Sequence, residues 1–318
     1  MKIYTLILFL LVANTLSGQP NYLTYHQQIQ EAESLLLKEA YASALESYGK
    51  AFEAYPFIFK RDYAIAFQVA LIQGEKEKAG LYLQQAIQSG LSWKGIKSFK
   101  KVLKGYPTLS QQEIKDIYLK NRDFIPNKLD EDLRDFVKEM FRKDQKKAFG
   151  NLLRFSEKGK KKYSESKFGP HSVQQMRKLD SLLSLGKYPG EQLIQNSFWA
   201  STIIGHHNSV SEDFVRMDSL YPQLRPSLLK VLKKGLMSPY ELAIMDSWRH
   251  RVGRFEGPNL GILNPVKAAT LSQTNQLRAE IGLPSVSHTN QLLAMEKESG
   301  LSLFVPGLDW WGDGIEVE

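Results

Sequence analysis

Cysteine is absent from this chain of 318 residues. Its absence excludes disulfide bonds, cysteine-ligated zinc, iron–sulfur clusters, thiol nucleophiles and a lipid anchor attached through an amino-terminal cysteine. A chain without thiols also suits an oxidising compartment, where a lone cysteine is a liability.

The familiar catalytic motifs are missing as well. The sequence has no Gly-Lys-Ser/Thr phosphate loop, no His-Glu-x-x-His, no Gly-x-Ser-x-Gly elbow and no Gly-x-Gly-x-x-Gly after a strand. These absences weigh against an enzyme of a familiar class and favour a non-enzymatic binding protein. We predict no organic cofactor and leave a divalent metal ion open as the alternative.

Long hydrophobic runs are confined to the amino terminus. Residues 1–19 combine a cation at Lys2, an apolar run over residues 3–13 and a small, polar stretch over residues 14–19, which is the pattern of a cleaved export signal. The run is too short to span roughly 30 Å of hydrocarbon as a membrane anchor. We therefore expect an exported protein of the periplasm or the extracellular space that is not integral to the membrane.

Alternation of apolar and polar residues with period two is nearly absent, whereas helical spacing recurs along the chain. With 42% hydrophobic and 24% charged residues, the composition is that of a globular protein. We predict an all-α fold in three parts after the signal: helical hairpins over 22–107, a second helical domain over 129–255 and a Gly/Pro-rich extension with a short helix over 256–318.

An internal repeat marks the first of these parts. Ala44, Tyr48 and Ala51 place a small, a large and a small residue on one helix face, and 35 residues later the same offsets from Ala79 are again small, apolar and small. Small residues let antiparallel helices approach closely. The pattern resembles the tetratricopeptide repeat family, with a degenerate third unit over 90–106, and the resemblance implies a protein or peptide partner bound through the helical repeats.

Helix start and stop signals divide the second part. The clearest start is Ser238-Pro239-Tyr240-Glu241, a capping box with proline at the first helical position. Ser211 is a second predicted cap. The apolar spacing predicts helices over 130–150, 174–185, 191–204, 224–234, 239–252 and, in the extension, 272–281.

Two surface features indicate possible partners. The segment 134–178 holds fourteen Lys or Arg against five Asp or Glu, and its sharpest part is Lys160-Lys161-Lys162. It predicts either an anion contact or an ordinary solvated helix face; nucleic acid is not expected because aromatic interleaving is missing. Trp310 and Trp311 form either a partner-docking peptide or a tail folded back on its parent domain.

One pair of adjacent histidines provides the first candidate metal-binding or catalytic site. His206 and His207 stand at the expected end of a helix, and adjacent helical residues point about 100° apart, so both can ligate one metal ion only if the backbone bends there. Gly205 permits such a bend. The alternative is that one imidazole caps the helix or is buried while the other faces solvent.

Two further acidic residues complete the candidate set. Asp246 lies three and four residues before Arg249 and His250, which predicts either a carboxylate-oriented histidine or a helix-surface ion pair. Asp144 precedes Gln145 on the predicted helix 130–150, within the basic segment. Taken alone, it is predicted to be a solvated residue.

Residues 129–255 resemble the bacterial domain of unknown function DUF6624. The resemblance rests on four short motifs in order along the chain: Asp144-Gln145, Asp180 before Gly-x-x-Pro, His206-His207, and Asp246 followed by Arg249. The sequence departs from that pattern where Ser247 and Trp248 separate the acid from the arginine. The family implies no established activity. Our preferred interpretation is a cell-envelope binding scaffold, and the alternative is a metal-dependent hydrolase that uses Asp144, His206, His207, Asp246 and Arg249.

Overall fold

A computed structural model of the chain describes residues 20–126, 129–303 and 314–318. The all-α prediction is confirmed: the described residues contain helices and a single isolated parallel bridge, between Val266 and Val317, and no strand. The predicted export signal and the Trp310-Trp311 pair lie outside the described residues. No helix in these ranges is both long and apolar enough to cross a membrane.

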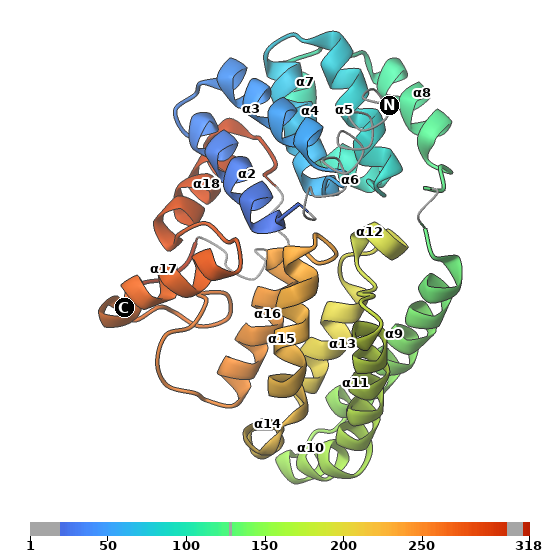
Figure 1. The fold of residues 1–318 in the computed structure, drawn as a ribbon, viewed down its shortest axis with the longest axis vertical. Coiled ribbons are helices and arrows are strands. Elements are labelled where there is room, and N and C mark those ends of the chain that lie inside the picture. The colour runs from blue at the N-terminus through green and yellow to red at the C-terminus, as the bar shows by residue number, and fades with distance from the viewer. Residues whose placement is uncertain (1–19, 127–128, 304–313) are drawn as a thin grey trace, which may run out of the picture.

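The amino-terminal part forms two helical hairpins, as predicted (Figure 1). Their helices are α2 (Tyr22–Leu36), α3 (Tyr41–Ala54), α4 (Lys60–Ile72) and α5 (Lys76–Gln88). The small residues of the repeat carry the contacts, since Ala44, Ala51, Ala79 and Ala86 are all at most 1% exposed. Close approach of α2 to α3 and of α4 to α5 therefore follows from the repeated small positions.

The degenerate third unit consists of two short helices, α6 (Trp93–Ser98) and α7 (Lys100–Gly105). The polar stretch after Pro107, which the sequence marks as a domain boundary, contains a helix that the apolar pattern did not predict, α8 (Gln111–Asn121). Ser110 starts it with a capping box closed by Glu113, and Ile114 joins the core of the hairpins. We call α2–α8 the hairpin unit.

The second unit comprises nine elements, with the buried faces of several helices around one apolar core. They are α9 (Glu131–Leu152), α10 (Glu157–Tyr163), a π-helical turn η1 (Ser164–Phe168), α11 (Gly169–Ser184), α12 (Glu191–Ile194), α13 (Trp199–His207), α14 (Glu212–Met217), α15 (Leu220–Lys233) and α16 (Pro239–Val252). Ser211 caps α14, and the capping box at Ser238 is present at the start of α16.

One predicted helix is wrong. The apolar spacing favours a continuous helix over 191–204, but the chain breaks between α12 and α13, where Gln195 adopts a left-handed conformation with φ of 51°. Asn196 then caps the restart through its side-chain oxygen, which accepts the backbone N–H groups of Phe198 and Trp199. The Asn196 side chain thus competes with the helical backbone hydrogen bonds and interrupts the helix, although the apolar spacing predicts that it continues.

The carboxyl-terminal extension holds a short 3-10 turn, η2 (Ala268–Thr270), and two helices, α17 (Leu271–Glu280) and α18 (Val286–Ser299), where the sequence predicts one. It packs on both units: Ile281 and Leu283 join the core of the second unit, while Leu292, Leu301 and Leu303 join that of the hairpin unit. In Figure 1 the two helices lie along the side of the hairpin unit and of α16.

The two units also meet directly. The ring of Tyr22 lies against Gly235, and a Cβ at this glycine would stand 2.5 Å from the ring carbons. The backbone N–H of Lys60 donates to the Glu191 carboxylate. The guanidinium of Arg61 lies 5.6 Å from the ring centre of Tyr240. Charged and aromatic groups are therefore enclosed where the hairpin unit contacts α12 and α16.

Candidate functional site

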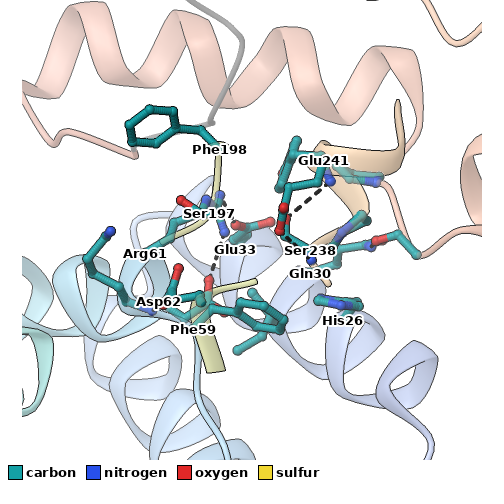
Figure 2. A pocket seen from close by; sticks show the side chains of 17 residues that line it. His26, Gln30, Glu33, Phe59, Arg61, Asp62, Ser197, Phe198, Ser238 and Glu241 are labelled. Carbon is teal, nitrogen blue, oxygen red and sulfur yellow. Dashed lines mark hydrogen bonds and ion pairs between the residues drawn. The ribbon is translucent and has the colours of Figure 1, made fainter. Parts of the chain in front are cut away.

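A cavity of about 350 Å³ lies at this junction, and we call it the junction cavity (Figure 2). Its walls come from all three parts of the chain, namely His26, Ile29, Gln30, Glu33 and residues 59–62 of the hairpin unit, Glu191, Ser197, Phe198 and residues 238–241 of the second unit, and Gly282 and Pro284 of the extension. Its size is within the range of small-ligand sites.

A buried ion network lines the hairpin side of the cavity. Arg61 donates to Glu33 at 2.5 Å and to Asp62 at 2.9 Å, and the hydroxyl of Tyr25 donates to Asp62 at 2.6 Å. These four residues are at most 9% exposed. Burial raises the pKa of Asp62, and the charge of Arg61 opposes that rise. The guanidinium therefore balances two carboxylates without solvent around them.

Two more carboxyl groups face the cavity from the second unit. Glu241 accepts the Tyr188 hydroxyl at 2.7 Å and, through the capping box, the backbone N–H of Ser238 at 3.1 Å. Burial raises the pKa of Glu241 to about 8, and the nearby charge of Glu191 adds to the rise. Burial likewise raises the pKa of Glu191, against the attraction of Lys60. The cavity thus stores a proton on Glu241 at neutral pH.

His26 provides an independent sign of an unmet interaction. This residue is 7% exposed, and its Nε2 atom has no hydrogen-bond partner among the described residues. Burial and the charge of Arg61 lower its pKa to about 3, so the ring is neutral at physiological pH. A buried polar atom without a partner typically costs about 1–3 kcal/mol, which a bound group with a complementary atom would recover.

A second cavity of about 280 Å³ adjoins the first, and we call it the His206 cavity. The two share Ser197, Phe198, Tyr240 and Glu241 as lining residues. Beyond them the His206 cavity is lined by α13 and α16, through Ser201, Thr202, Gly205, His206, Ile244 and Trp248. The two cavities are therefore neighbours, with the four shared residues between them.

Asp144 and His206, which the hydrolase alternative places in one pocket with His207 and Asp246, are in direct contact. The Oδ2 atom of Asp144 lies 2.5 Å from His206 Nδ1. The Asp144 side chain is wholly buried rather than solvated, while the His206 side chain keeps 26% of its surface exposed. The bond fixes which ring nitrogen faces away from α9, because Nδ1 is occupied by the carboxylate.

His207 points elsewhere, because α13 continues through both histidines without a bend. Its Nδ1 atom lies 3.1 Å from Ser172 Oγ, and its Nε2 atom lies 3.2 Å from Asp218 Oδ1. Asp218 in turn accepts Arg249 at 3.1 Å. Since His207 and Ser172 are almost fully buried, this row of polar groups fastens α11, α13 and α16 together.

The remaining predicted residues of α16 separate as well. Asp246 pairs with Arg225 at 2.8 Å and accepts the Tyr221 hydroxyl at 2.6 Å, rather than pairing with Arg249. His250 Nδ1 lies 2.9 Å from the Asn264 amide. His206, His207 and Asp246 therefore have three different partners. Within the described ranges no group of three or more His, Asp or Glu side chains is arranged to hold a metal ion.

The basic segment forms the exposed tip of the second unit. Lys160, Lys161 and Lys162 belong to α10, and Lys161 pairs with Asp213 at 3.2 Å and with Glu165 at 3.8 Å. These acidic neighbours offset part of the local charge. The whole segment 134–178 spans α9, α10, η1 and the first part of α11, and none of these elements contributes a residue to either cavity.

Sequence reasoning missed the junction cavity, since its residues come from segments more than 200 positions apart. One signal was available in the repeats: Glu33, Arg61 and Asp62 interrupt the apolar faces of helices whose neighbours are buried. Charged residues at core positions require partners. Which partners they find depends on how the two units pack.

Comparisons with known proteins return nothing for this chain: no protein-family model matches it, and no curated protein or solved structure is detectably similar. The helical hairpins are established by their packing. The resemblances to tetratricopeptide repeats and to DUF6624 stay predictions based on short motifs.

Proposed function

We propose that this chain is an exported binding protein whose junction cavity receives the amine end of a short peptide or a similarly small amine. The observation that carries the proposal is the surplus of carboxyl groups around a partly open, largely apolar cavity. The predicted export signal supports a place in the cell envelope.

The charge balance of the cavity favours a cationic group. Four acidic residues line it, Glu33, Asp62, Glu191 and Glu241, against the two cations Lys60 and Arg61. Glu241 holds a proton at neutral pH, and a bound cation would displace that proton. Arg61 is already shared between two of the carboxylates. A protonated amine near Glu191 and Glu241 would supply the missing positive charge. Its attraction to the carboxylates strengthens as water is excluded from the cavity.

The rest of the lining favours an organic ligand over a bare ion. Ile29, Phe59, Pro239 and Pro284 form apolar walls, and the half-exposed ring of Phe198 stands at the boundary with the His206 cavity. Figure 2 shows Phe59 and His26 on the hairpin side, across from Ser238 and Glu241. A side chain next to the amine can bury its surface there, with His26 as a polar partner.

The extension directs a partner toward this cavity. Leu292, Leu301 and Leu303 occupy part of the hairpin surface, and Gln68 is bonded to the backbone of Ser302 in both directions. That part of the repeat surface is covered by the chain itself. A peptide partner of the repeats would therefore enter end-on at the junction.

The test compares two probes that differ in one charge, the dipeptide Ala-Phe-amide and its N-acetyl form. We expect the free amine to bind and to raise the melting temperature in a concentration-dependent way, and the acetylated form to do neither. Glu191→Gln should weaken binding of the amine by tenfold or more, whereas Glu139→Gln, on the exposed face of α9, should not. Equal binding of both probes would contradict the proposal.

A further inference from the structure

The His206 cavity, next to the junction cavity, is lined by a histidine whose geometry is that of a general base. His206 lies at the last turn of α13 and lines the second cavity. Its Nδ1 atom is bonded to Asp144, while its Nε2 atom has no hydrogen-bond partner among the described residues. This is the arrangement in which a carboxylate orients an imidazole and stabilises its protonated form.

The supporting residues fix the ring in place. Asp144 is fully buried, and its second oxygen, Oδ1, has no partner among the described residues. The ring of Phe168 lies edge-on to His206 at 6.2 Å. On the opposite side α16 approaches closely, since a Cβ at Gly205 would stand 3.2 Å from Trp248. A buried carboxylate bonded to Nδ1 holds the imidazole in one orientation.

We infer that Asp144 and His206 form a general-base dyad that hydrolyses small carboxylic esters bound in the His206 cavity. Water attacks the ester carbonyl carbon while His206 Nε2 takes its proton. The new C–O bond forms as the carbonyl electron pair moves to oxygen. The tetrahedral intermediate then reforms the carbonyl and expels the alkoxide, which receives the proton from the imidazolium. Asp144 acts as a positioning residue.

Esters are favoured over amides because the dyad works with water as the nucleophile. No hydroxyl of the described residues is hydrogen-bonded to His206 Nε2, so the geometry offers no acyl-enzyme route. A single base serves best when the leaving group departs without strong acid assistance, as an alkoxide or phenolate does. The inference does not rest on amine binding in the junction cavity.

The charged groups around the dyad are few. Glu241 of α16 lines the same cavity. Burial lowers the pKa of His171 of α11, and the charge of nearby Asp144 opposes that lowering. Lys143 and Lys147 of α9 lie near His171 and lower that pKa. Asp144 is thus the carboxylate in direct contact with His206.

The experiment measures hydrolysis of p-nitrophenyl acetate and p-nitrophenyl butyrate by the full chain. We expect saturable turnover that falls at least 100-fold in kcat/KM in His206→Gln, because general-base catalysis contributes about 10²–10⁴. Asp144→Asn should lower kcat by a similar factor and leave KM within twofold, as a loss of orientation in the transition state predicts. His250→Gln, outside both cavities, should keep the full rate.

Melting temperatures of the variants check their folding. If His206→Gln does not fold, diethyl pyrocarbonate on the native chain replaces it: carbethoxylation of His206, located by mass spectrometry, should abolish turnover in proportion to its extent. Three results would overturn the inference: no saturable hydrolysis by the native chain, an undiminished rate in His206→Gln or after His206 is modified, or equal rates in Asp144→Asn and His250→Gln.

Discussion

At the scale of single residues, the junction is built from ionisable side chains that have left water. Arg61 lies between Glu33 and Asp62, and Tyr25 supplies a further hydrogen bond. Each member is satisfied by the others, so removal of one leaves charges that nothing else compensates. These residues therefore determine both the stability of the junction and the charge that a ligand meets there.

Arg61→Met should lower the free energy of unfolding by about 3–5 kcal/mol, because two buried carboxylates lose their common partner. Urea denaturation followed by circular dichroism measures the change. Arg142→Met removes an arginine of similar shape from an exposed pair with Glu139 and should leave the midpoint unchanged. A shift of less than about 1 kcal/mol in Arg61→Met would show that the network is solvated.

Glu241 should make stability depend on pH. Glu241 keeps its proton up to about pH 8 in the folded state, whereas a glutamate in the unfolded chain loses it near the ordinary pKa of 4.5. The folded state therefore binds more protons between these values, so the free energy of unfolding falls as pH rises, by at most about 1.4 kcal/mol per pH unit. Glu241→Gln should remove this part of the slope. Parallel pH profiles for the two proteins, from urea titrations between pH 5 and 8, would contradict the assignment.

At the scale of elements, caps and turns explain which helices could be predicted. The box at Ser238 and the cap at Ser211 act within three or four residues, and both are present as predicted. The break at Gln195 was missed because its signal, Asn196, is weaker than the apolar spacing around it. Helix α8 was missed because few of its residues are apolar, and its capping box at Ser110 was the available signal.

Gly235 ends α15 and also contacts the hairpin unit. Its φ of 75° favours glycine, and a side chain there would collide with the Tyr22 ring. Gly235→Ala should lower the free energy of unfolding by about 1–2 kcal/mol for the left-handed backbone and by a further amount for displacement of the ring. Gly74→Ala is the matched control, since its φ is 69° and no atom lies within 4 Å of the added Cβ. If urea denaturation gives equal losses in the free energy of unfolding for the two variants, the Tyr22 ring moves aside at no measurable cost, which would contradict this prediction.

At the scale of the whole molecule, each helical unit has its own apolar core, and the extension contributes residues to both. The extension contributes Leu283 to one core and Leu303 to the other, and the junction adds buried polar contacts between Lys60 and Glu191. The sequence predicts the helices and their grouping because those depend on local spacing and caps. The junction cavity and the pairing of Asp144 with His206 depend on contacts between distant segments, which a single sequence does not encode in any short pattern.

The extension should make unfolding cooperative, because it contributes buried residues to the cores of both units. We expect differential scanning calorimetry to show one transition whose van't Hoff and calorimetric enthalpies agree. Leu303→Ala should lower the midpoint of that single transition without splitting it. Two separate transitions in the native chain would show that the units are independent and that the junction forms only weakly.

Amine binding at the junction cavity is tested most directly by calorimetric titration with Ala-Phe-amide at pH 7 in buffers of different ionisation enthalpy. If the amine replaces the proton held on Glu241, binding should release up to about one proton per ligand, since a carboxyl group with a pKa of about 8 is still mostly protonated at this pH. Glu241→Gln should bind without this release. Binding with no proton release from the native chain, or no binding at all, would contradict an amine site at the junction.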